Sequence, residues 1–519
     1  MASNIAIYAF IALIAWFFYR DRRLRPMTSA ALWVPLLWLL IIGTRPVSFW
    51  FNPGLRPDKV EAYLEGSPLD AGGYLLLLVL GIAVLLRRRV NWGAVISANR
   101  WVAVFFLYCL ISVLWSEYSF VGLKRWVKDF GNVVMVLVVL SETNPVAALR
   151  AMLVRYAYLV IPLSMMFIKY VPDIGRYYDP WSWQPMFRGV AGEKNALGAT
   201  VAFAVLFLIW DLIEGRRARL AATAAAQDAV TPAAEPAAGV ARIATAPRPR
   251  GKLPAGVPAP LGAVDIGGRV LLFAIAAWLL DKADSSNAQV CVALGGLVLY
   301  YFGRSIAGKQ VLVRHLGWYI LLVLFAVLFV YLVPGVLGWI LGMLGEDPTL
   351  TGRVDLWTDL LAVPNSEIFG AGYQSFWLGS AIDTLWLKYS FKPNQAHNGY
   401  IETYLNLGII GVVLLFGLLF SAGARLRARM LAGEAVAVLY FALLAFVLFY
   451  SWSEAMFSNM TPAWFLTLVA TITYQRVGAE ALTPATRWAR HRGAPQSAPA
   501  DKPSGLKPSA LKPSRMGRP

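Results

Sequence analysis

Segment 398–421, NGYIETYLNLGIIGVVLLFGLLFS, is an almost uninterrupted apolar run in which Glu402 is the one charged side chain. An α-helix rises about 1.5 Å per residue, so a run of this length can cross the roughly 30 Å hydrocarbon core of a bilayer. The chain of 519 residues is 58% hydrophobic and 15% charged, whereas soluble domains average about 45–50% apolar and about 25% charged residues. The sequence therefore predicts an all-α polytopic membrane protein.

Similar apolar runs predict 12 or 13 transmembrane helices, because the run at 269–281 is short enough to be a half-span. The predicted spans lie at 3–19, 31–49, 73–86, 101–115, 125–140, 151–170, 195–213, 269–281, 287–303, 316–343, 398–421, 434–452 and 462–475.

Lys and Arg residues gather in five of the segments between these spans, and this pattern predicts their orientation. These segments are 20–30, 87–100, 214–268, 304–315 and 422–433. If the spans alternate in direction, all five lie on one side, and basic loops mark the cytoplasmic side. The net charge of +18 is then an orientation signal rather than a sign of nucleic-acid binding. We expect a multi-pass protein of the bacterial inner membrane with a cytoplasmic C-terminus.

The same pattern predicts the domain organisation. Segment 218–268 is rich in Ala and Pro with few large apolar residues, and cannot build a core. The tail repeats KPSGL-KPSAL-KPSR, which suits either a solubilising role or anionic lipid. The predicted parts are N-terminal helices (1–213, with periplasmic loop 171–194), a disordered cytoplasmic linker (214–268), further helices (269–343), a large periplasmic loop (344–397), C-terminal helices (398–477) and a disordered basic tail (478–519).

The two outward loops hold groups that suit a phosphorylated ligand. Arg188 and Lys194 end the first loop, and Arg353 begins a short predicted helix, 353–361, in the second. A guanidinium matches phosphate oxygens, and a helix N-terminus favours an anion. His397 closes the second loop at the membrane interface, where a neutral imidazole can accept a proton. Lipid headgroup contact for Arg188 and a plain hydrogen-bonding role for His397 are equally open alternatives.

Aromatic and acidic residues complete the set of candidates. The faces of Tyr178, Trp183 and Trp357 are suited to stacking on sugar rings, although a single interfacial aromatic residue is more often a membrane anchor. Glu402 and Glu454 lie within or near spans, where carboxylates are functional candidates by position, and pairing with a neighbouring helix is the alternative.

Several motifs resemble the O-antigen ligase and polysaccharide polymerase superfamily. They are FRGVAGEKNALG (187–198), DKADSSNAQVCVALG (281–295), TGRVDLW (351–357), IFGAGYQSFW (368–377) and AHNGYIETYLNLGIIG (396–411), and the resemblance covers about 101–475. The KNALG form is more similar to exopolysaccharide polymerases of the succinoglycan type than to lipopolysaccharide core ligases. Two features depart from the family pattern: Glu193 replaces a usual His, Ser or Asn, and 283–287 lacks an Arg seen in many ligases.

The resemblance implies a GT-C-type helical fold with an outward-facing cavity, and an inverting, metal-independent glycosyltransferase without a cofactor. Its donor would be an oligosaccharide linked to undecaprenyl diphosphate. Carried over, Arg188 and Arg353 would hold the diphosphate, and His397 would activate the acceptor hydroxyl. Lys194 and Asn195 would complete the first loop's part of the site, and Asn398 would orient a partner.

The resemblance predicts polymerisation of lipid-linked repeat units into a surface or exopolysaccharide, with other assembly and export proteins as further partners. Ligation of a glycan to lipid A core or to a protein is the alternative, because both reactions would use a similar donor site. A flippase or transporter is a third hypothesis, which the scarcity of charge at the bilayer midplane disfavours. The sugar, the linkage, the acceptor and the oligomeric state are not encoded in any motif.

Overall fold

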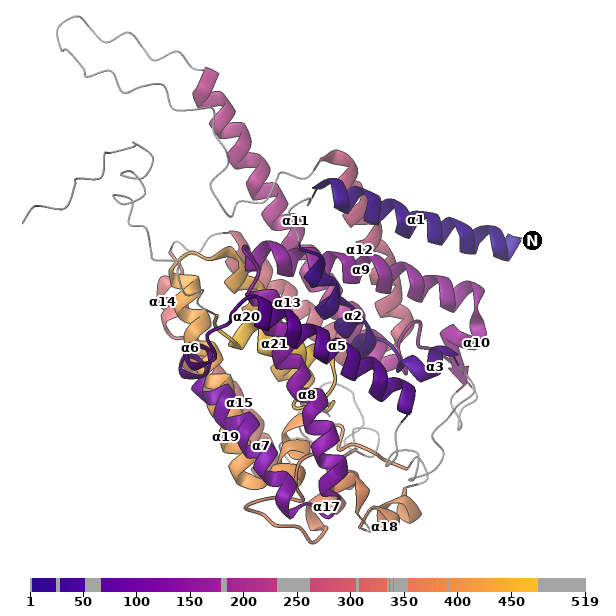
Figure 1. Ribbon diagram of the computed structural model, residues 1–519, viewed down its shortest axis with the longest axis vertical. Coiled ribbons are helices and arrows are strands. Elements are labelled where there is room, and N and C mark those ends of the chain that lie inside the picture. Colours follow the sequence, from indigo (N-terminus) through magenta and orange to yellow (C-terminus); the bar gives the residue numbers. More distant parts are fainter. Residues whose placement is uncertain are drawn as a thin grey trace, which may run out of the picture. The chain divides into compact units, whose positions relative to one another are not determined.

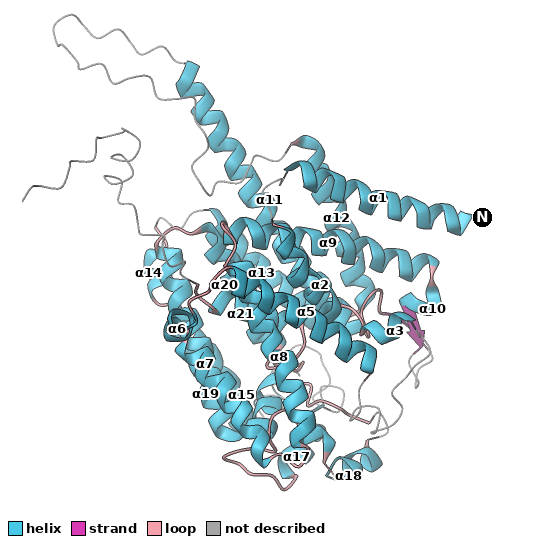
Figure 2. Ribbon diagram, in the orientation of Figure 1, coloured by secondary structure: helices cyan, strands magenta, loops and turns pink. Residues whose placement is uncertain are grey.

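The computed structural model describes residues 2–24, 29–51, 67–178, 184–230, 262–304, 308–333, 353–379, 381–389 and 392–474, together with positions 336 and 339. Helices make up most of these residues (Figure 2). A short antiparallel pair of strands, β1 (Arg176–Tyr178) and β2 (Pro185–Phe187), lies in the first outward loop. The predicted all-α class is confirmed. Trp183, residues 231–261 of the predicted linker and the tail from 475 onward lie outside the described residues.

Every predicted span has a helix at its place (Figure 1). These helices are α1 (Ala2–Leu24), α2 (Trp33–Gly43), α5 (Pro68–Arg87), α7 (Arg100–Ile111), α8 (Ser119–Leu140), α9 (Pro145–Tyr170), α11 (Lys194–Val230), α12 (Ala263–Ala283), α13 (Ser286–Arg304), α15 (Leu316–Leu332), α19 (Gly399–Leu431), α20 (Ala435–Tyr450) and α21 (Pro462–Thr471).

Shorter helices lie between them. They are α3 (Val47–Phe51), α6 (Trp92–Ala98), α10 (Pro172–Gly175), α14 (Gln310–Arg314), α17 (Arg353–Ala362) and α18 (Ala381–Lys388), with 3-10 turns η1 (Ala30–Leu32), η2 (Ser112–Trp115) and η3 (Phe376–Leu378). By length and apolar composition, 6 helices of the described part can each cross a bilayer, and the bent pair α6–α7 would be a seventh.

The structure corrects two predicted boundaries. Helix α12 has 21 residues, so the run at 269–281 belongs to a helix that is long and apolar enough for a full span. Asp265, before this run, and Arg269, at its start, are buried in ion pairs with Arg20 and Asp211 respectively, so their charges do not interrupt the helix. Helix α11 continues to Val230, inside the predicted linker. Ala and Arg are strong helix formers, so a segment that cannot build a core can still be helical.

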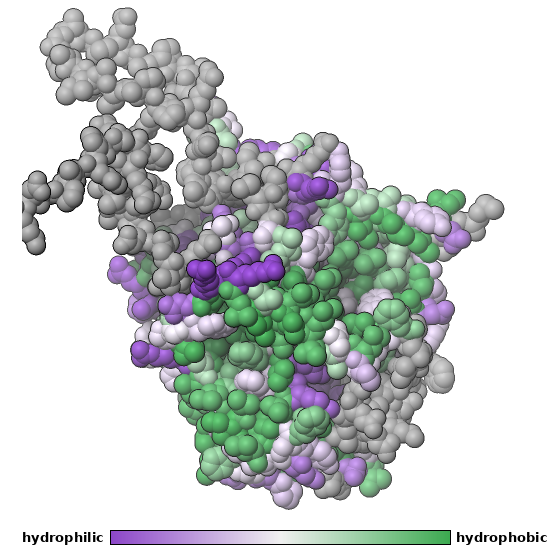
Figure 3. Space-filling view, viewed as in Figure 1, coloured by the Kyte–Doolittle hydropathy of each residue, from purple (hydrophilic) through white to green (hydrophobic). Residues whose placement is uncertain are grey.

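Apolar side chains cover much of the visible surface over α5 and α7 (Figure 3). On α5, Leu75, Leu76 and Val79 are all more than half exposed. Soluble monomers rarely expose so large a contiguous apolar patch, whereas lipid tails are an apolar solvent for such a surface. The surface and the apolar helices together are those of a multi-pass membrane protein.

Contacts between the five basic loops bring them together, as alternating spans require. Ser29 and Arg88 both donate to the carboxylate of Glu142. The remaining links are Arg425 Nη1 to Asn99 Oδ1 at 2.8 Å, Arg427 Nη1 to the Arg314 carbonyl at 3.3 Å, and Arg217 to the Gly303 carbonyl. Glu142 lies in the turn between α8 and α9, and Gly303 directly precedes loop 304–315. Through these contacts the described parts of the basic segments lie at one end of the helices.

A kink in α19 fixes the large outward loop. Gly408 has φ 62° and ψ −167°, and this interrupts the helix. The freed backbone pairs with the loop, since Ala371 N donates to Leu405 O at 3.0 Å and Ile409 N to Glu367 O at 2.9 Å. A Cβ atom on Gly408 would lie 2.2 Å from the Ile368 carbonyl oxygen. Only glycine suits both the positive φ and this close approach.

The large loop also has a small core of its own. Leu356 and Leu360 from α17, Leu385 from α18, and Ile401 and Leu405 from α19 form a buried cluster. Through this cluster the loop packs on the start of α19, so that α17 and α18 lie at the opposite end of α19 from α14 (Figure 1).

Candidate functional site

The buried carboxylate of Glu454, between α20 and α21, joins three distant parts of the chain. Its Oε1 accepts from Asn195 Nδ2 at 2.9 Å and from Arg353 Nη2 at 3.3 Å. Its Oε2 lies 3.2 Å from His397 Nδ1. We call these four residues the Glu454 cluster. Three of them, Asn195, Arg353 and His397, are residues that the sequence placed in one site, and the structure brings them together.

His397 is held by unusual local backbone. Its φ of 48° lies in the left-handed region, which non-glycine residues rarely adopt and which concentrates at functional sites. The next residue, Asn398, is fully buried and caps α19, accepting from the backbone N–H groups of Tyr400 and Ile401. Its Nδ2 donates to the Trp452 carbonyl at 3.0 Å. Asn398 therefore fixes the start of α19 against the segment that carries Glu454.

Ala396, the residue before His397, is held by hydrogen bonds at both its carbonyl and its backbone N–H. Trp357 Nε1 donates to the Ala396 carbonyl at 2.8 Å, and Ala396 N donates to Glu402 Oε2 at 2.8 Å. Trp357 is only 3% exposed and packs in the small core of the loop. Its ring is thus covered by protein, and its position is that of a support for His397 rather than of a surface for sugar stacking.

Arg353 is the first residue of α17, as predicted. Its Nη1 donates to the Ser453 carbonyl at 2.7 Å, next to its ion pair with Glu454. About a quarter of the side chain stays exposed. A guanidinium has five N–H donors, so the two contacts leave donors of Arg353 for an anion at this surface.

The first outward loop reaches the cluster through the start of α11. Tyr450 donates to the Asn195 carbonyl at 3.0 Å, which anchors the first turn of the helix. Lys194 makes a 3.5 Å ion pair with the exposed Asp284, a kind of contact that contributes little to stability.

Glu193, just before α11, interacts electrostatically with three residues of the same cluster. Burial raises the pKa of Glu193, and the Glu454 carboxylate raises it further, while His397 and Arg353 lower it. The position at which the sequence departs from the family pattern therefore lies at the site itself.

Arg188 lies at the end of β2, in the first outward loop. Its Nε and Nη2 donate to the Ile174 and Asp173 carbonyls at 3.0 and 3.2 Å, and its guanidinium lies 5.7 Å from the centre of the Tyr177 ring. These contacts stay within the loop and do not join Arg188 to the Glu454 cluster. Arg188 is five positions before Glu193 in the chain, which limits the distance between their Cα atoms to about 18 Å. Tyr178, at the end of β1, is 61% exposed.

The arrangement is suited to proton transfer beside a cation. If Nδ1–H of His397 donates to Glu454, the ring nitrogen Nε2 keeps its lone pair. Among the described residues no protein group bonds to this nitrogen. A carboxylate that orients a histidine in this way is the arrangement of general bases in hydrolases. Arg353, on the other oxygen of the same carboxylate, adds a positive charge to the site.

The sequence by itself marks Glu454 only as a carboxylate near a span. It stands in SWSEAMFSN (451–459), which belongs to none of the family motifs. Its link to His397 spans 57 residues and its link to Arg353 spans 101. Only the rule that charged residues near a membrane are functional candidates pointed to it.

Comparison with known proteins agrees with these motifs. Residues 270–416 match the model of a family described as O-antigen ligase. The chain is also 25% identical over 335 residues to the exopolysaccharide production protein ExoQ of Rhizobium meliloti (strain 1021). That match covers 62% of this chain and 64% of the relative, less than two thirds of its length. The predicted resemblance to the O-antigen ligase and polysaccharide polymerase superfamily is confirmed, and the matched family segment contains Arg353 and His397.

Proposed function

We propose that this chain is a membrane glycosyltransferase that moves a saccharide from a lipid diphosphate to a hydroxyl group, with the Glu454 cluster as its reaction centre. The observation that carries the proposal is the convergence of Arg353, His397 and Asn195, from three separate segments, on one buried carboxylate. The similarity to the O-antigen ligase family and to ExoQ supports the same reaction class.

His397 acts as the general base for the acceptor. As the acceptor oxygen bonds to C1 of the donor sugar, the bond from C1 to the diphosphate oxygen breaks. The hydroxyl proton passes to Nε2 of His397, and the lipid diphosphate leaves with the bonding electrons, so attack from the opposite face inverts C1. A positioned base of this kind contributes about 10²–10⁴ in rate.

Arg353 stabilises the leaving diphosphate. Diphosphate is a good leaving group, so positive charge matters more than a strong acid, and removing one such donor costs about 10²–10³ in rate. Arg188 and Lys194 supply further positive charge from the first outward loop. Within the Glu454 cluster, Asn195 shares a carboxylate oxygen with Arg353 and holds this part of the site together.

The proposed biological reaction is polymerisation of undecaprenyl-diphosphate-linked repeat units, since the relative ExoQ is named for exopolysaccharide production. The matched family model is described as O-antigen ligase, so ligation to lipid A core or to a protein is the second candidate. In both cases the chain lies in the inner membrane with basic loops in the cytoplasm and the Glu454 cluster facing the periplasm. Other assembly and export proteins are further expected partners.

The test uses a host that lacks the chromosomal copy and depends on this chain for its polysaccharide. Arg353→Ala and His397→Ala are expected to stop polymer production and to accumulate lipid-linked saccharide units, at normal protein levels in the membrane. Arg427→Ala is the control, because this exposed arginine contacts the Arg314 carbonyl at the basic end of the helices.

The accumulated material identifies the reaction. Single lipid-linked repeats indicate a polymerase, and long lipid-linked glycans indicate a ligase. Normal polymer from both Ala variants would overturn the proposed chemistry. Retention of lipid-linked units on the cytoplasmic side would instead show that the chain transports these units across the membrane.

A further inference from the structure

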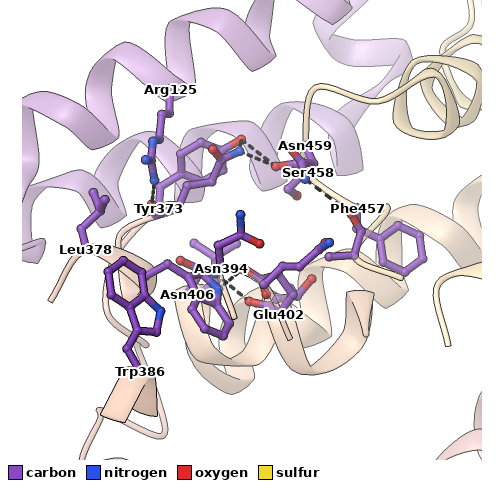
Figure 4. Close-up of a pocket in the computed structure, with 16 residues that line it drawn as sticks. Arg125, Tyr373, Leu378, Trp386, Asn394, Glu402, Asn406, Phe457, Ser458 and Asn459 are labelled. Atoms are coloured by element: carbon purple, nitrogen blue, oxygen red, sulfur yellow. Dashed lines mark hydrogen bonds between the residues drawn. The ribbon is translucent and has the colours of Figure 1, made fainter. Parts of the chain in front are cut away.

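A cavity of about 160 Å³ lies between α8, the large outward loop, α19 and the segment that follows Glu454 (Figure 4). An engineered apolar cavity of about 150 Å³ takes up benzene, so this space is large enough for one six-membered ring. Its walls include Arg125, Gln374, Trp377, Trp386, Gln395 and Glu402. Arg125, from α8, lies across the cavity from Trp386 and Glu402 (Figure 4).

The cavity borders the Glu454 cluster without including it. Gln395 stands two residues before His397, and Ala455, another wall residue, directly follows Glu454. Consecutive Cα atoms are about 3.8 Å apart, so both wall residues lie within about 8 Å of cluster residues along the backbone. A ring bound in the cavity can therefore belong to the same saccharide chain as a sugar at His397.

Two indole rings form fixed apolar surfaces on the wall. Trp377 Nε1 donates to Glu402 Oε1 at 2.7 Å, and Trp386 Nε1 donates to the Pro393 carbonyl at 2.8 Å. Because their N–H groups are bonded, both rings are held in place with their apolar atoms available. The C–H faces of a pyranose ring are apolar and fit such surfaces.

The polar groups of the wall are only partly used within the protein. Arg125 donates to the Gln374 backbone carbonyl and makes no second hydrogen bond among the described residues. Gln374 donates through Nε2 to the Ser458 carbonyl at 2.6 Å, and its own side-chain oxygen accepts no bond from that part of the chain. The amide of Gln395 has no partner there either. Side-chain donors and acceptors that are half-buried and unused suit the hydroxyl groups of a ligand.

We propose that this cavity is a saccharide subsite that holds one pyranose ring of the glycan, next to the sugar that reacts at His397. The proposal rests on the proposed function, because it places the ring in the same glycan. Apolar ring faces would lie on Trp377 and Trp386, and hydroxyl groups would bond to Arg125, Gln374 and Gln395. The subsite thus gives the enzyme a means to recognise its own repeat unit beyond the reacting sugar.

Direct binding to the full-length chain in lipid nanodiscs tests the subsite. The probe is the mixture of short oligosaccharides that mild acid releases from the host's own polysaccharide, which carry neither lipid nor diphosphate. Saturation-transfer NMR titrations report their affinity. Gln395→Ala and Arg125→Lys are each expected to weaken binding roughly 10-fold, because each removes hydrogen bonds to hydroxyl groups. Asn394→Trp, at an exposed position of the wall, is expected to fill the entrance and abolish binding without unfolding the chain.

Two controls separate this inference from the proposed function. Gln310→Ala changes an exposed amide at the start of α14 and should bind like the wild type. Arg353→Ala should also bind the free oligosaccharides but should not transfer. Wild-type affinity in all three cavity variants would overturn the subsite and leave the proposed function standing. Active transfer by Arg353→Ala would instead overturn the proposed function.

Discussion

The carboxylate oxygen Oε2 of Glu454 lies 3.2 Å from Nδ1 of His397, while Oε1 of the same carboxylate lies 3.3 Å from Nη2 of Arg353. One side chain therefore orients the proposed base and positions the proposed phosphate ligand. Both contacts come from segments that lie far from Glu454 in sequence, so the geometry of the site depends on a single buried residue.

Glu454→Gln should keep the packing of this side chain and remove the carboxylate that orients His397 and Arg353. The amide has nearly the same shape, but it carries no charge and can accept through only one of its two terminal atoms. We expect transfer to fall about 10²–10³-fold, as for the loss of an electrostatic partner at a reaction centre, with normal membrane levels of the protein. The measurement is the initial rate of polymer formation from lipid-linked units. Glu434→Gln is the matched control, because Glu434 pairs with Arg429 and is partly exposed; equal rates for the two variants would contradict the role of Glu454.

His397→Gly should remove the imidazole and at the same time relieve the backbone strain at this position. A non-glycine residue at positive φ costs about 1–2 kcal/mol, and glycine removes this cost. The variant is expected to melt at the same temperature as the wild type or higher, while transfer falls at least about 10²-fold. Thermal unfolding in detergent and the transfer rate are measured on the same preparation. A stable and active glycine variant would show that the imidazole has no part in the reaction.

Arg353→Lys should retain the positive charge and lose the planar guanidinium geometry. The guanidinium contacts the Ser453 carbonyl and Glu454 at once, and a lysine ammonium cannot reproduce this planar geometry. Transfer is expected to fall about 10–100-fold, with a higher KM for the lipid diphosphate donor. Arg427→Lys, at the basic end of the helices, should leave both kinetic constants unchanged. A normal donor KM in Arg353→Lys would remove Arg353 from the diphosphate site.

Glu193→Gln should change how stability depends on pH. Burial raises the pKa of Glu193 in the folded chain, so the folded state holds this proton more tightly than the unfolded state, whose Glu pKa is about 4.3. Stability from this group is then present at low pH and is lost as pH rises from about 4.3 through the raised folded value.

The neutral glutamine avoids that loss. The melting temperature of the wild type should therefore fall relative to Glu193→Gln as pH increases from 4.5 to 8 in matched buffers. Parallel melting curves across this range would contradict the raised pKa.

Gly408→Ala should loosen the large outward loop. The new methyl group would meet the Ile368 carbonyl at 2.2 Å, at a φ of 62° that alanine tolerates poorly. We expect a loss of stability of at least about 1–3 kcal/mol, with faster protease cleavage of residues 364–397. Gly296→Ala is the control, because no atom lies within 4 Å of its added Cβ and alanine favours a helix. Equal proteolysis of the two variants would show that the loop does not depend on the kink.

Much of the fold was predictable because membrane-spanning helices depend on local composition. An apolar run of sufficient length must form a helix in lipid, where every backbone group needs an internal partner. Each predicted span, such as 398–421 in α19, accordingly has its helix. The errors at α11 and α12 arose where charged or Ala-rich residues extend a helix beyond its apolar part. Their ion pairs, such as Arg269 with Asp211, form only after the helices pack.

The candidate site was predictable in its residue types and only partly in its geometry. The sequence alone determined the membrane class, the motifs and the basic and imidazole groups Arg353 and His397, because these are properties of short segments. Tertiary structure alone decided that Glu454 joins them, that Trp357 and Asn398 support the backbone around His397, and that Arg188 bonds within its own loop. A hydrogen bond or ion pair across 57 or 101 residues depends on how α11, α17, α19 and the α20–α21 segment pack together, and no local pattern encodes that packing.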